Sequence, residues 1–346
     1  MAENLTTNLN LGTQLIALHY PQIDVNEIKI IQNEPVKTIW KMETSVGTFC
    51  LKRIRKSVPV VKFTTAAQDY LYKKGALVAG IIPTQSGELF FVHEGYGFVL
   101  YQWINGSQLE MEEVEEQAYV GLSGLAQFHK DSVGFVPPAD SQTYDRMGVW
   151  PNHYKKMLDE MKKWKVIAET KTTPFALAYL KVIDEMIDLA EQATQMLDAS
   201  YYSEWLKEIG PYGYLCHQDY GSGNALQTNH GVYVLDLDNV AYDLPLRDVR
   251  KLITKRMEQI GVWELAELEK LLNSYEGILP LTDEQRKILY IDLLYPHHFY
   301  GCVKNPFKKG IAGEEKKILK HYRVEIEKLP VLCELLNTNL IVKKKK

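Results

Sequence analysis

The chain of 346 residues has few cysteines and no long apolar run. Its four cysteines lie far apart and form no CxxC pair, so they fit reduced thiols in a cytosolic protein rather than a zinc site or a disulfide framework. No apolar run approaches the roughly 20 residues of a membrane span. The start, MAENLTTNLNLG, lacks the basic and apolar parts of a signal peptide. We therefore expect cytoplasmic synthesis without a signal peptide, and no membrane span.

A strong charge of one sign is also absent. The net charge is −4, from 40 basic and 44 acidic residues, so no strong field favours nucleic acid or an anionic membrane. One basic run, Lys343 to Lys346, closes the chain, and short terminal runs usually serve solubility. The content of 46% hydrophobic and 24% charged residues is that of a soluble globular protein. The length suits two lobes better than one small core.

Strand patterns dominate the first 105 residues. A helix is expected at 11–20, and a second helix is expected to end at Gly75. A tight hairpin turn is expected at SVG, 45–47, where Gly47 can take positive φ. The predicted strands are EIKII, TIWKMET, TFCLKRI, ELFFVHEG and GFVLYQWI. The polar segment NGSQ is the natural hinge, so we expect a β-rich N-terminal lobe of residues 1–105.

From residue 107 onward the hydrophobic period becomes helical. Three short β-type pieces, YGYLCHQD, NALQTNHG and VYVLDLD, interrupt the helices. The predicted fold class is therefore α+β, with the small β-rich lobe followed by a larger helical lobe of residues 106–346. The helices are expected at about 112–132, 152–168, 174–199, 201–208, 247–258, 262–275, 282–300 and 313–337.

Oxygen-bearing side chains gather in and after the stretch CHQDYGSGNAL, residues 216–226. Asp219 lies in a loop between apolar pieces, Asn224 follows after two glycines, and Asp236 ends the next strand. Carboxylate and amide oxygens suit a hard cation such as Mg²⁺. Phosphoryl transfer needs such ions on the phosphate oxygens and one carboxylate that is free to orient the attacking hydroxyl. The spacing H-x-D-x4-N, with a later Asp, provides one base and two metal ligands.

The pattern HQDYGSGN followed by VLDLD resembles the catalytic core of aminoglycoside phosphotransferase-like and choline-kinase-like enzymes. The resemblance covers most of the chain and implies a two-lobed protein-kinase-like fold. Within this group the chain resembles most the spore coat proteins of the CotS and CotI type, and the CotI type more closely. The further segments that carry the likeness are FCLKR for the ATP-binding lysine strand, FVLYQWINGSQL for the hinge, LAQFHKDSVGF for a helix end, and YDLPLRDVRKLI after the metal site.

The resemblance implies cofactors, partners and residue roles. The cofactors would be ATP, or another nucleoside triphosphate, and Mg²⁺. The partners would be the nucleotide, an unknown hydroxyl acceptor and other coat proteins, without nucleic acid, and the location would be the spore coat. The implied catalytic residues are Asp219 as the base and Asn224, and Asn224 and Asp236 would bind Mg²⁺. Nucleotide binding would use Lys52 for the phosphates, the backbone of Gln102 and Ile104 for adenine, and Tyr101 at the gatekeeper position. His217 would have a structural role.

Simpler explanations exist for single residues of this set. A lone H-x-D is common, Asn224 beside a glycine could be a turn residue, and Asp238 could end a strand rather than approach a second metal. Lys52 alone could be a solvated strand lysine. Their order and spacing, after a β-rich lobe that carries LKR, favour the kinase-like fold.

The segment YPHHFYG, residues 295–301, lies late in the helical lobe, where the related enzymes bind their acceptor. His297, His298 and Tyr300 could line that substrate pocket. The alternative is a half-buried helix with ordinary aromatic packing.

Two departures from the family pattern concern the nucleotide clamp. The phosphate-covering loop reads QNEPVKT, where Pro35 adds stiffness and no glycine permits close backbone approach. The helix after Lys52 should supply a glutamate partner, but KFTTAAQDYLYKKG has none in its first half. The residues near that position are Thr64, Thr65, Gln68 and Asp69. Lys52 would then be unpaired and less well positioned.

Two functions therefore remain open. The first is an ATP- and Mg-dependent phosphotransferase that acts on an alcohol group of a small molecule or sugar-like acceptor. The second is a catalytically weak or inactive kinase-fold protein with a structural role in the spore coat.

Overall fold

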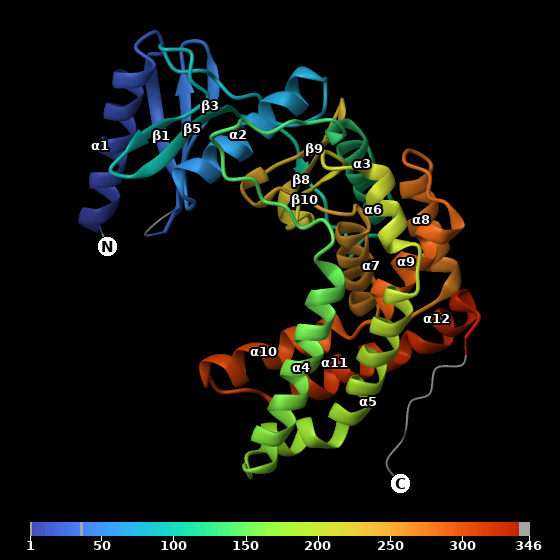
Figure 1. The fold of residues 1–346 in the computed structure, drawn as a ribbon. Helices are drawn as coiled ribbons and strands as arrows, with labels where there is room; N and C mark the ends of the chain where they lie inside the picture. Colours follow the sequence, from blue (N-terminus) through green and yellow to red (C-terminus); the bar gives the residue numbers. More distant parts are fainter. Residues whose placement is uncertain (1, 35–36, 339–346) are drawn as a thin grey trace. The chain divides into compact units, whose positions relative to one another are not determined.

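The structure of the chain is a computed structural model, and it describes residues 2–34 and 37–338 (Figure 1). Pro35 and the basic run 343–346 lie outside the described residues. The chain forms two compact units, each assembled from three stretches. Unit 1 comprises residues 1–110, 123–145 and 212–243, and unit 2 comprises residues 111–122, 146–211 and 244–346.

Unit 1 is built on a five-stranded antiparallel sheet in the order β1-β2-β3-β5-β4. Alternation of buried and more exposed side chains along β2 matches a sheet with one face toward a core. Trp40 is fully buried in this core, and its indole Nε1 donates a hydrogen bond to the Asn8 carbonyl. The elements are α1 (Ala2–His19), β1 (Val25–Asn33), β2 (Thr38–Thr44), β3 (Gly47–Ile54), β4 (Phe91–His93) and β5 (Tyr96–Gln102). The predicted strands are therefore confirmed.

Helix α2 (Val58–Lys73) follows β3 in the chain and packs on β5. Gly97 permits the close approach, because a Cβ atom there would lie 2.9 Å from a methyl group of Val61. Gly75 follows the helix with φ +84°, a conformation that glycine takes at little cost. The predicted end of this helix is confirmed.

The short β-type pieces of the later sequence also belong to unit 1. Three strands form a small sheet in the order β6-β8-β9, and two more pair as β10-β7. Gly106 lies directly before β6 in the chain. The backbone at Gln227 approaches it so closely that a Cβ atom on residue 106 would lie 2.7 Å from the Gln227 carbonyl oxygen. The strands are β6 (Ser107–Gln108), β7 (Leu215–Cys216), β8 (Ala225–Thr228), β9 (Gly231–Val234) and β10 (Ala241–Tyr242).

Unit 2 is helical. Its helices are α4 (Trp150–Glu169), α5 (Pro174–Asp198), α6 (Tyr202–Ile209), α7 (Leu246–Ile260), α8 (Leu265–Glu276), α9 (Asp283–Leu294), α10 (His297–Lys309), α11 (Glu315–Glu327) and α12 (Leu329–Leu336), and α3 (Glu115–Ser132) supplies residues to both units. The single helices predicted at 282–300 and 313–337 are wrong. Each is two helices, because Pro296 and Pro330 lack the N–H that would continue the hydrogen-bonded ladder.

The observed layout confirms the predicted α+β class, with a small antiparallel sheet and a larger helical part. The lobe boundary at residue 105 stays a prediction. Among the described helices, none combines the length and the apolar character that crossing a bilayer requires.

Candidate nucleotide and phosphoryl-transfer site

A pocket of about 410 Å³ opens in unit 1. Its walls come from β1, β2, β3, β5, the segment after β5 and the β8–β9 region. Ile39, Ala79 and Leu226 give it apolar walls. The predicted residues that line it are Lys52, Tyr101, Gln102, Ile104, Asn224 and Asp236. Residues predicted for nucleotide and metal binding, up to 184 positions apart in the chain, therefore meet at one cavity.

Lys52 is the charged centre of this pocket. Its Nζ donates to Oδ1 of Asp236 at 2.8 Å and to Oδ1 of Asp238 at 2.7 Å, while the residue is only 5% exposed. Burial alone would lower the pKa of Lys52, but Asp238 and Asp236 outweigh it, so the pKa lies above its ordinary value and the ammonium stays charged. The expectation of an unpaired Lys52 is wrong.

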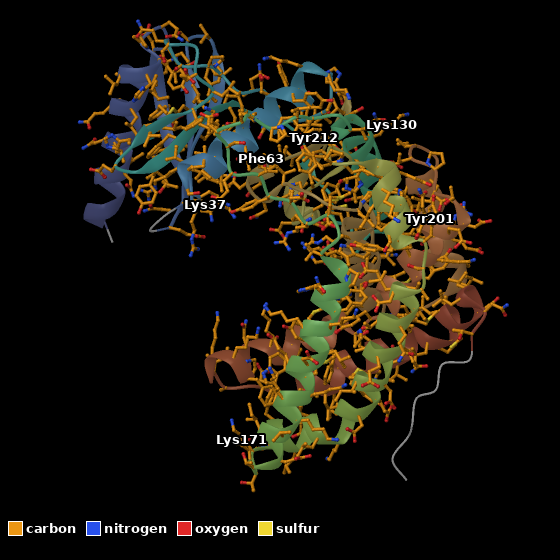
Figure 2. The ribbon with its side chains drawn as sticks, viewed as in Figure 1. Lys37, Phe63, Lys130, Lys171, Tyr201 and Tyr212 are labelled. Carbon is orange, nitrogen blue, oxygen red and sulfur yellow. The ribbon has the colours of Figure 1, made fainter. Side chains whose placement is uncertain are left out.

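Lys37 is a second cation of the site that the sequence did not single out. It precedes β2 (Figure 2), and its Nζ lies 3.0 Å from Oδ2 of Asp236. Burial raises the pKa of Asp236, but Lys52 and then Lys37 lower it more, so the pKa lies below its ordinary value. Burial raises the pKa of Asp238, and Asp236 adds to this against the pull of Lys52. Two lysines and two aspartates thus form one linked ion-pair group.

The loop that carries Asp219 is held by a buried histidine. His217 is fully buried, its Nε2 lies 2.7 Å from the Leu235 carbonyl, and its Nδ1 accepts from the Asp219 backbone N–H at 3.2 Å. This pair of bonds requires the imidazole proton on Nε2. The Asp219 residue itself is exposed, so a fixed backbone presents this carboxylate-bearing residue at the surface of the unit.

Asn224 closes the same loop at the end of the short 3₁₀ helix η1 (Ser222–Asn224). Its Nδ2 donates to the Asp219 carbonyl at 3.0 Å, and its own carbonyl accepts from the Leu235 N–H at 2.9 Å. Since the amide nitrogen is a donor within the loop, Oδ1 is the atom suited to a cation.

Backbone strain is concentrated beside these residues. Among the described residues other than glycine, Gln218 (φ 68°) and Asp236 (φ 59°) are two of four with positive φ. The left-handed region is costly for a side chain such as that of glutamine. Such strain persists where surrounding structure fixes it, and it is common at functional sites.

Of the residues predicted for the hinge, Tyr101 and Gln102 end β5 and Ile104 follows it. Tyr101 is 8% exposed, and burial raises the pKa of its phenol well above the ordinary value. The Gln102 N–H donates to the Gly80 carbonyl at 2.8 Å. A contact from Gln102 to adenine would therefore use its carbonyl, whereas Ile104 lies at the pocket wall.

Helix α2 provides no acidic partner to Lys52. The hydroxyl of Thr65 donates to the Val61 carbonyl at 2.8 Å, and Gln68 Nε2 donates to the Ala79 carbonyl at 2.7 Å. Asp69, the one carboxylate in the sequence of α2, pairs with Lys73 at 2.7 Å. Asp238 on the 3₁₀ helix η2 (Leu237–Asn239) occupies the partner role instead.

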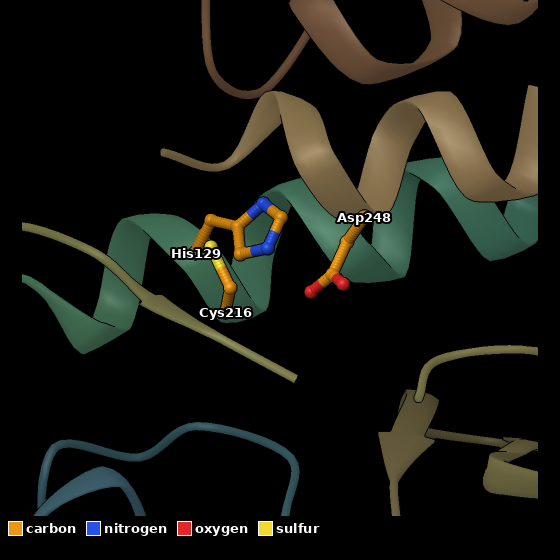
Figure 3. A group of neighbouring side chains, drawn as sticks. All are labelled: His129, Cys216 and Asp248. Carbon is orange, nitrogen blue, oxygen red and sulfur yellow. The ribbon is translucent and has the colours of Figure 1, made fainter. Parts of the chain in front are cut away.

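The end of α3 supports the strand before the catalytic loop. Figure 3 shows His129 of α3 beside Cys216 of β7, and both side chains are fully buried. One turn later, Oγ of Ser132 accepts from the Leu215 N–H at 2.8 Å. The segment LAQFHKDS therefore packs against and stabilises β7, the strand that leads into His217.

The three residues predicted to line an acceptor pocket lie on α10 of unit 2, and each contacts a different acid. His297 Nε2 lies 2.8 Å from Asp292 Oδ1, and His298 Nδ1 lies 3.0 Å from Glu258 Oε2. The third residue, Tyr300, donates its hydroxyl to Glu160 and stacks on Trp164. Their role toward an acceptor stays a prediction.

The hydroxyl of Tyr300 offers a test of the packing alternative. Tyr300→Phe keeps the ring and removes only the bond to Glu160, so we expect a loss of about 1 kcal/mol in the free energy of unfolding. Tyr322→Phe is the matched control, because its hydroxyl donates to Glu185 at 2.8 Å in the same unit. Urea denaturation of both variants measures this. If Tyr322→Phe lowers the free energy of unfolding and Tyr300→Phe does not, the Tyr300 hydroxyl is not needed for packing and is available to an acceptor.

Comparison with known proteins identifies a family and a related spore coat protein. The family model described as “Spore coat putative kinase YutH” matches residues 23–330. “Spore coat protein S” of Bacillus subtilis is 29% identical over 283 residues, which cover 82% of this chain and 80% of that protein.

Solved structures of phosphotransferases share the fold. An aminoglycoside phosphotransferase from Alicyclobacillus acidocaldarius has a TM-score of 0.74 at 16% identity, covering 92% of this chain and 95% of that one. Spectinomycin phosphotransferase APH(9)-Ia, solved with ADP and spectinomycin, has a TM-score of 0.58 at 15% identity, covering 92% and 93%. The fold is therefore that of kinase-like phosphotransferases.

Proposed function

The chain belongs to the “Spore coat putative kinase YutH” family, and from this premise we propose that it is a spore-coat-associated phosphotransferase. It moves the γ-phosphoryl group of ATP, or of another nucleoside triphosphate, to a hydroxyl of a small molecule or sugar-like acceptor. The observation that carries the proposal is the ion pair between Lys52 and Asp236. It joins a lysine of β3 to a carboxylate of the kind that binds Mg²⁺, at a pocket of about 410 Å³.

The residues present fit a nucleotide and Mg²⁺. Asn224 and Asp236 offer an amide and a carboxylate oxygen for the cation, and Lys52 and Lys37 offer two ammonium groups for phosphate oxygens. A bound Mg²⁺ would neutralise charge that develops on those oxygens. Without nucleotide, the lysines and aspartates neutralise one another.

The remaining roles are those that the family resemblance implies, and contacts in unit 1 support them. Asp219 orients the acceptor hydroxyl and accepts its proton, and His217 fixes the backbone that carries Asp219. Tyr101 is the gatekeeper, while the Gln102 carbonyl and the Ile104 backbone meet the base.

We also propose the spore coat as the location, with other coat proteins as partners. The support is the family of coat proteins to which the chain belongs and its likeness to spore coat protein S. A closer likeness to the CotI type stays a prediction, and so does the division into a nucleotide lobe of residues 1–105 and an acceptor lobe of residues 106–346.

A second function, a kinase-fold coat component without turnover, is favoured by two features. The loop before Lys37 has no glycine, and α2 has no glutamate. It predicts that no hydroxyl acceptor is phosphorylated, whether or not nucleotide binds.

Nucleotide binding is the first test. We expect millimolar Mg-ATP to stabilise the wild-type chain against thermal unfolding, by about 2.7 kcal/mol at a hundredfold excess over Kd. Asp236→Asn should lose most of this gain, because it removes a carboxylate from the metal position. Asp140→Asn is the matched control, since Asp140 is an exposed acid of unit 1 that pairs with Lys62.

Differential scanning fluorimetry with and without Mg-ATP measures these shifts. An equal shift for Asp236→Asn and the wild type would remove Asp236 from the metal site. No shift for the wild type at millimolar nucleotide would refute the phosphotransferase proposal and favour the scaffold.

A further inference from the structure

A cluster of two histidines and one glutamate lies on unit 2 and includes no residue assigned above to nucleotide or base chemistry. Glu258 belongs to α7, His298 to α10 and His321 to α11 (Figure 1). One ligand atom from each lies within 4.8 Å of the other two. Three helices thus present nitrogen and carboxylate donors to one point.

The spacing of these atoms fits one small cation. His298 Nδ1 lies 3.0 Å from Glu258 Oε2, and His321 Nδ1 lies 3.8 Å from Glu258 Oε1. These distances end on the two different oxygens of Glu258, so the carboxylate faces both imidazoles. Two ligands of a tetrahedral Zn²⁺ at its usual bond lengths are about 3.4 Å apart, so side-chain rotations must bring one of these oxygens and the two nitrogens to that separation.

The imidazole of His321 has a polar atom that the protein leaves unused. Its Nδ1 is buried and has no hydrogen-bond partner among the described residues. An imidazole with its proton on Nε2 carries a lone pair on Nδ1, and that form binds a metal. A buried polar atom without a partner is unfavourable, and a cation would satisfy it.

The carboxylate of the cluster pairs with a lysine. Lys320 Nζ lies 2.9 Å from Glu258 Oε1, but this lysine side chain is 64% exposed. It can therefore swing into water when a cation takes its place. The side chains of Glu258, His298 and His321 are 16%, 19% and 22% exposed, so an ion can enter from solvent.

We propose that Glu258, His298 and His321 form a Zn²⁺ site that joins α7, α10 and α11. Two imidazoles and one carboxylate are a ligand set that Zn²⁺ favours. The fourth position is open to water. The wide separation of the cysteines does not bear on this site, because its ligands are histidine and glutamate. His298 is then a metal ligand rather than part of an acceptor pocket.

The test uses the full chain without a polyhistidine tag, stripped of metal by a chelator that is then removed. Calorimetric titration with ZnCl₂ should show one equivalent bound with a Kd in the micromolar range or tighter, and the melting temperature should rise. His298→Gln and His321→Gln should each weaken binding about tenfold or more. His230→Gln is the matched control, because His230 lies in an exposed turn of unit 1, and it should bind as the wild type does.

Lys320→Met separates a metal site from a plain salt bridge. Removing the lysine takes away the competitor for Glu258, so Zn²⁺ should bind as tightly as in the wild type or more tightly. Weaker binding in this variant would contradict the proposal.

A spectroscopic test needs no variant and therefore survives a failure of the histidine variants to fold. Co²⁺ added to the stripped wild type should give the intense visible absorption of a tetrahedral site. Only the weak spectrum of octahedral Co²⁺, no stoichiometric binding of Zn²⁺, or unchanged binding in His321→Gln would overturn the site.

Discussion

Replacing Asp219 by asparagine is expected to lower the turnover number about 10²- to 10⁴-fold, the range that a positioned general base contributes. The affinity for Mg-ATP should stay within about threefold of the wild type, because Asp219 does not line the nucleotide pocket. Asparagine keeps the shape and the backbone bond to His217, so the loop should hold its conformation. The change removes the carboxylate that accepts the proton.

Transfer of labelled γ-phosphate to a panel of amino sugars and amino alcohols measures this, with release of inorganic phosphate as a second readout when water is the acceptor. Asp140→Asn, an exposed acid in the same unit, should turn over as the wild type does. Wild-type turnover in Asp219→Asn would remove Asp219 from the base role. Nucleotide binding by a wild-type chain that modifies no acceptor would favour the scaffold.

The fold was predictable because most of its determinants are local. Period-two stretches gave the strands of unit 1, and Gly75 marked the end of α2. The two errors in helix count arise at Pro296 and Pro330, where one residue interrupts a long apolar period. Hydrophobic spacing alone continues across such a residue, whereas the backbone ladder does not.

The candidate site was predictable where its residues are neighbours in sequence. The loop from His217 to Asn224 closes on itself through hydrogen bonds across two and five positions. The partner of Lys52 was not predictable in this way, because Asp238 is 186 positions away in the chain. The direction of its side chain is set by the 3₁₀ helix η2. Lys37 was missed because a lysine beside a loop ordinarily points into water.

The pairing of Lys52 with Asp238 changes the meaning of the missing glutamate. In related kinases an acid on the helix after this lysine holds it in place. Here a carboxylate from the segment after β9 makes a 2.7 Å contact with the same ammonium. The absence of the glutamate from α2 is therefore not by itself a reason to consider the site inactive.

Lys52→Met should be among the most destabilising changes in unit 1. It removes an ammonium that contacts both Asp236 and Asp238, and the lysine is 5% and Asp238 8% exposed. Breaking a buried ion pair from one side costs about 3–5 kcal/mol, because the remaining charge is left without compensation. Lys37→Met is the matched control. Among the described residues its ion pair is with Asp236, its side chain is 23% exposed, and partly exposed pairs contribute about 1 kcal/mol or less.

A double-variant cycle shows whether Asp238 is the partner that matters. Adding Asp238→Asn to Lys52→Met removes one uncompensated carboxylate, so the pair of changes should cost less than the sum of the two single changes by about 1–3 kcal/mol. Urea unfolding at neutral pH without nucleotide gives all four free energies, and the readout is independent of catalysis. Additive effects would mean that Asp238 does not hold Lys52, and the lysine would then depend on Asp236 alone. A strong coupling would instead make Asp238 the acid that positions the phosphate-binding lysine in this chain.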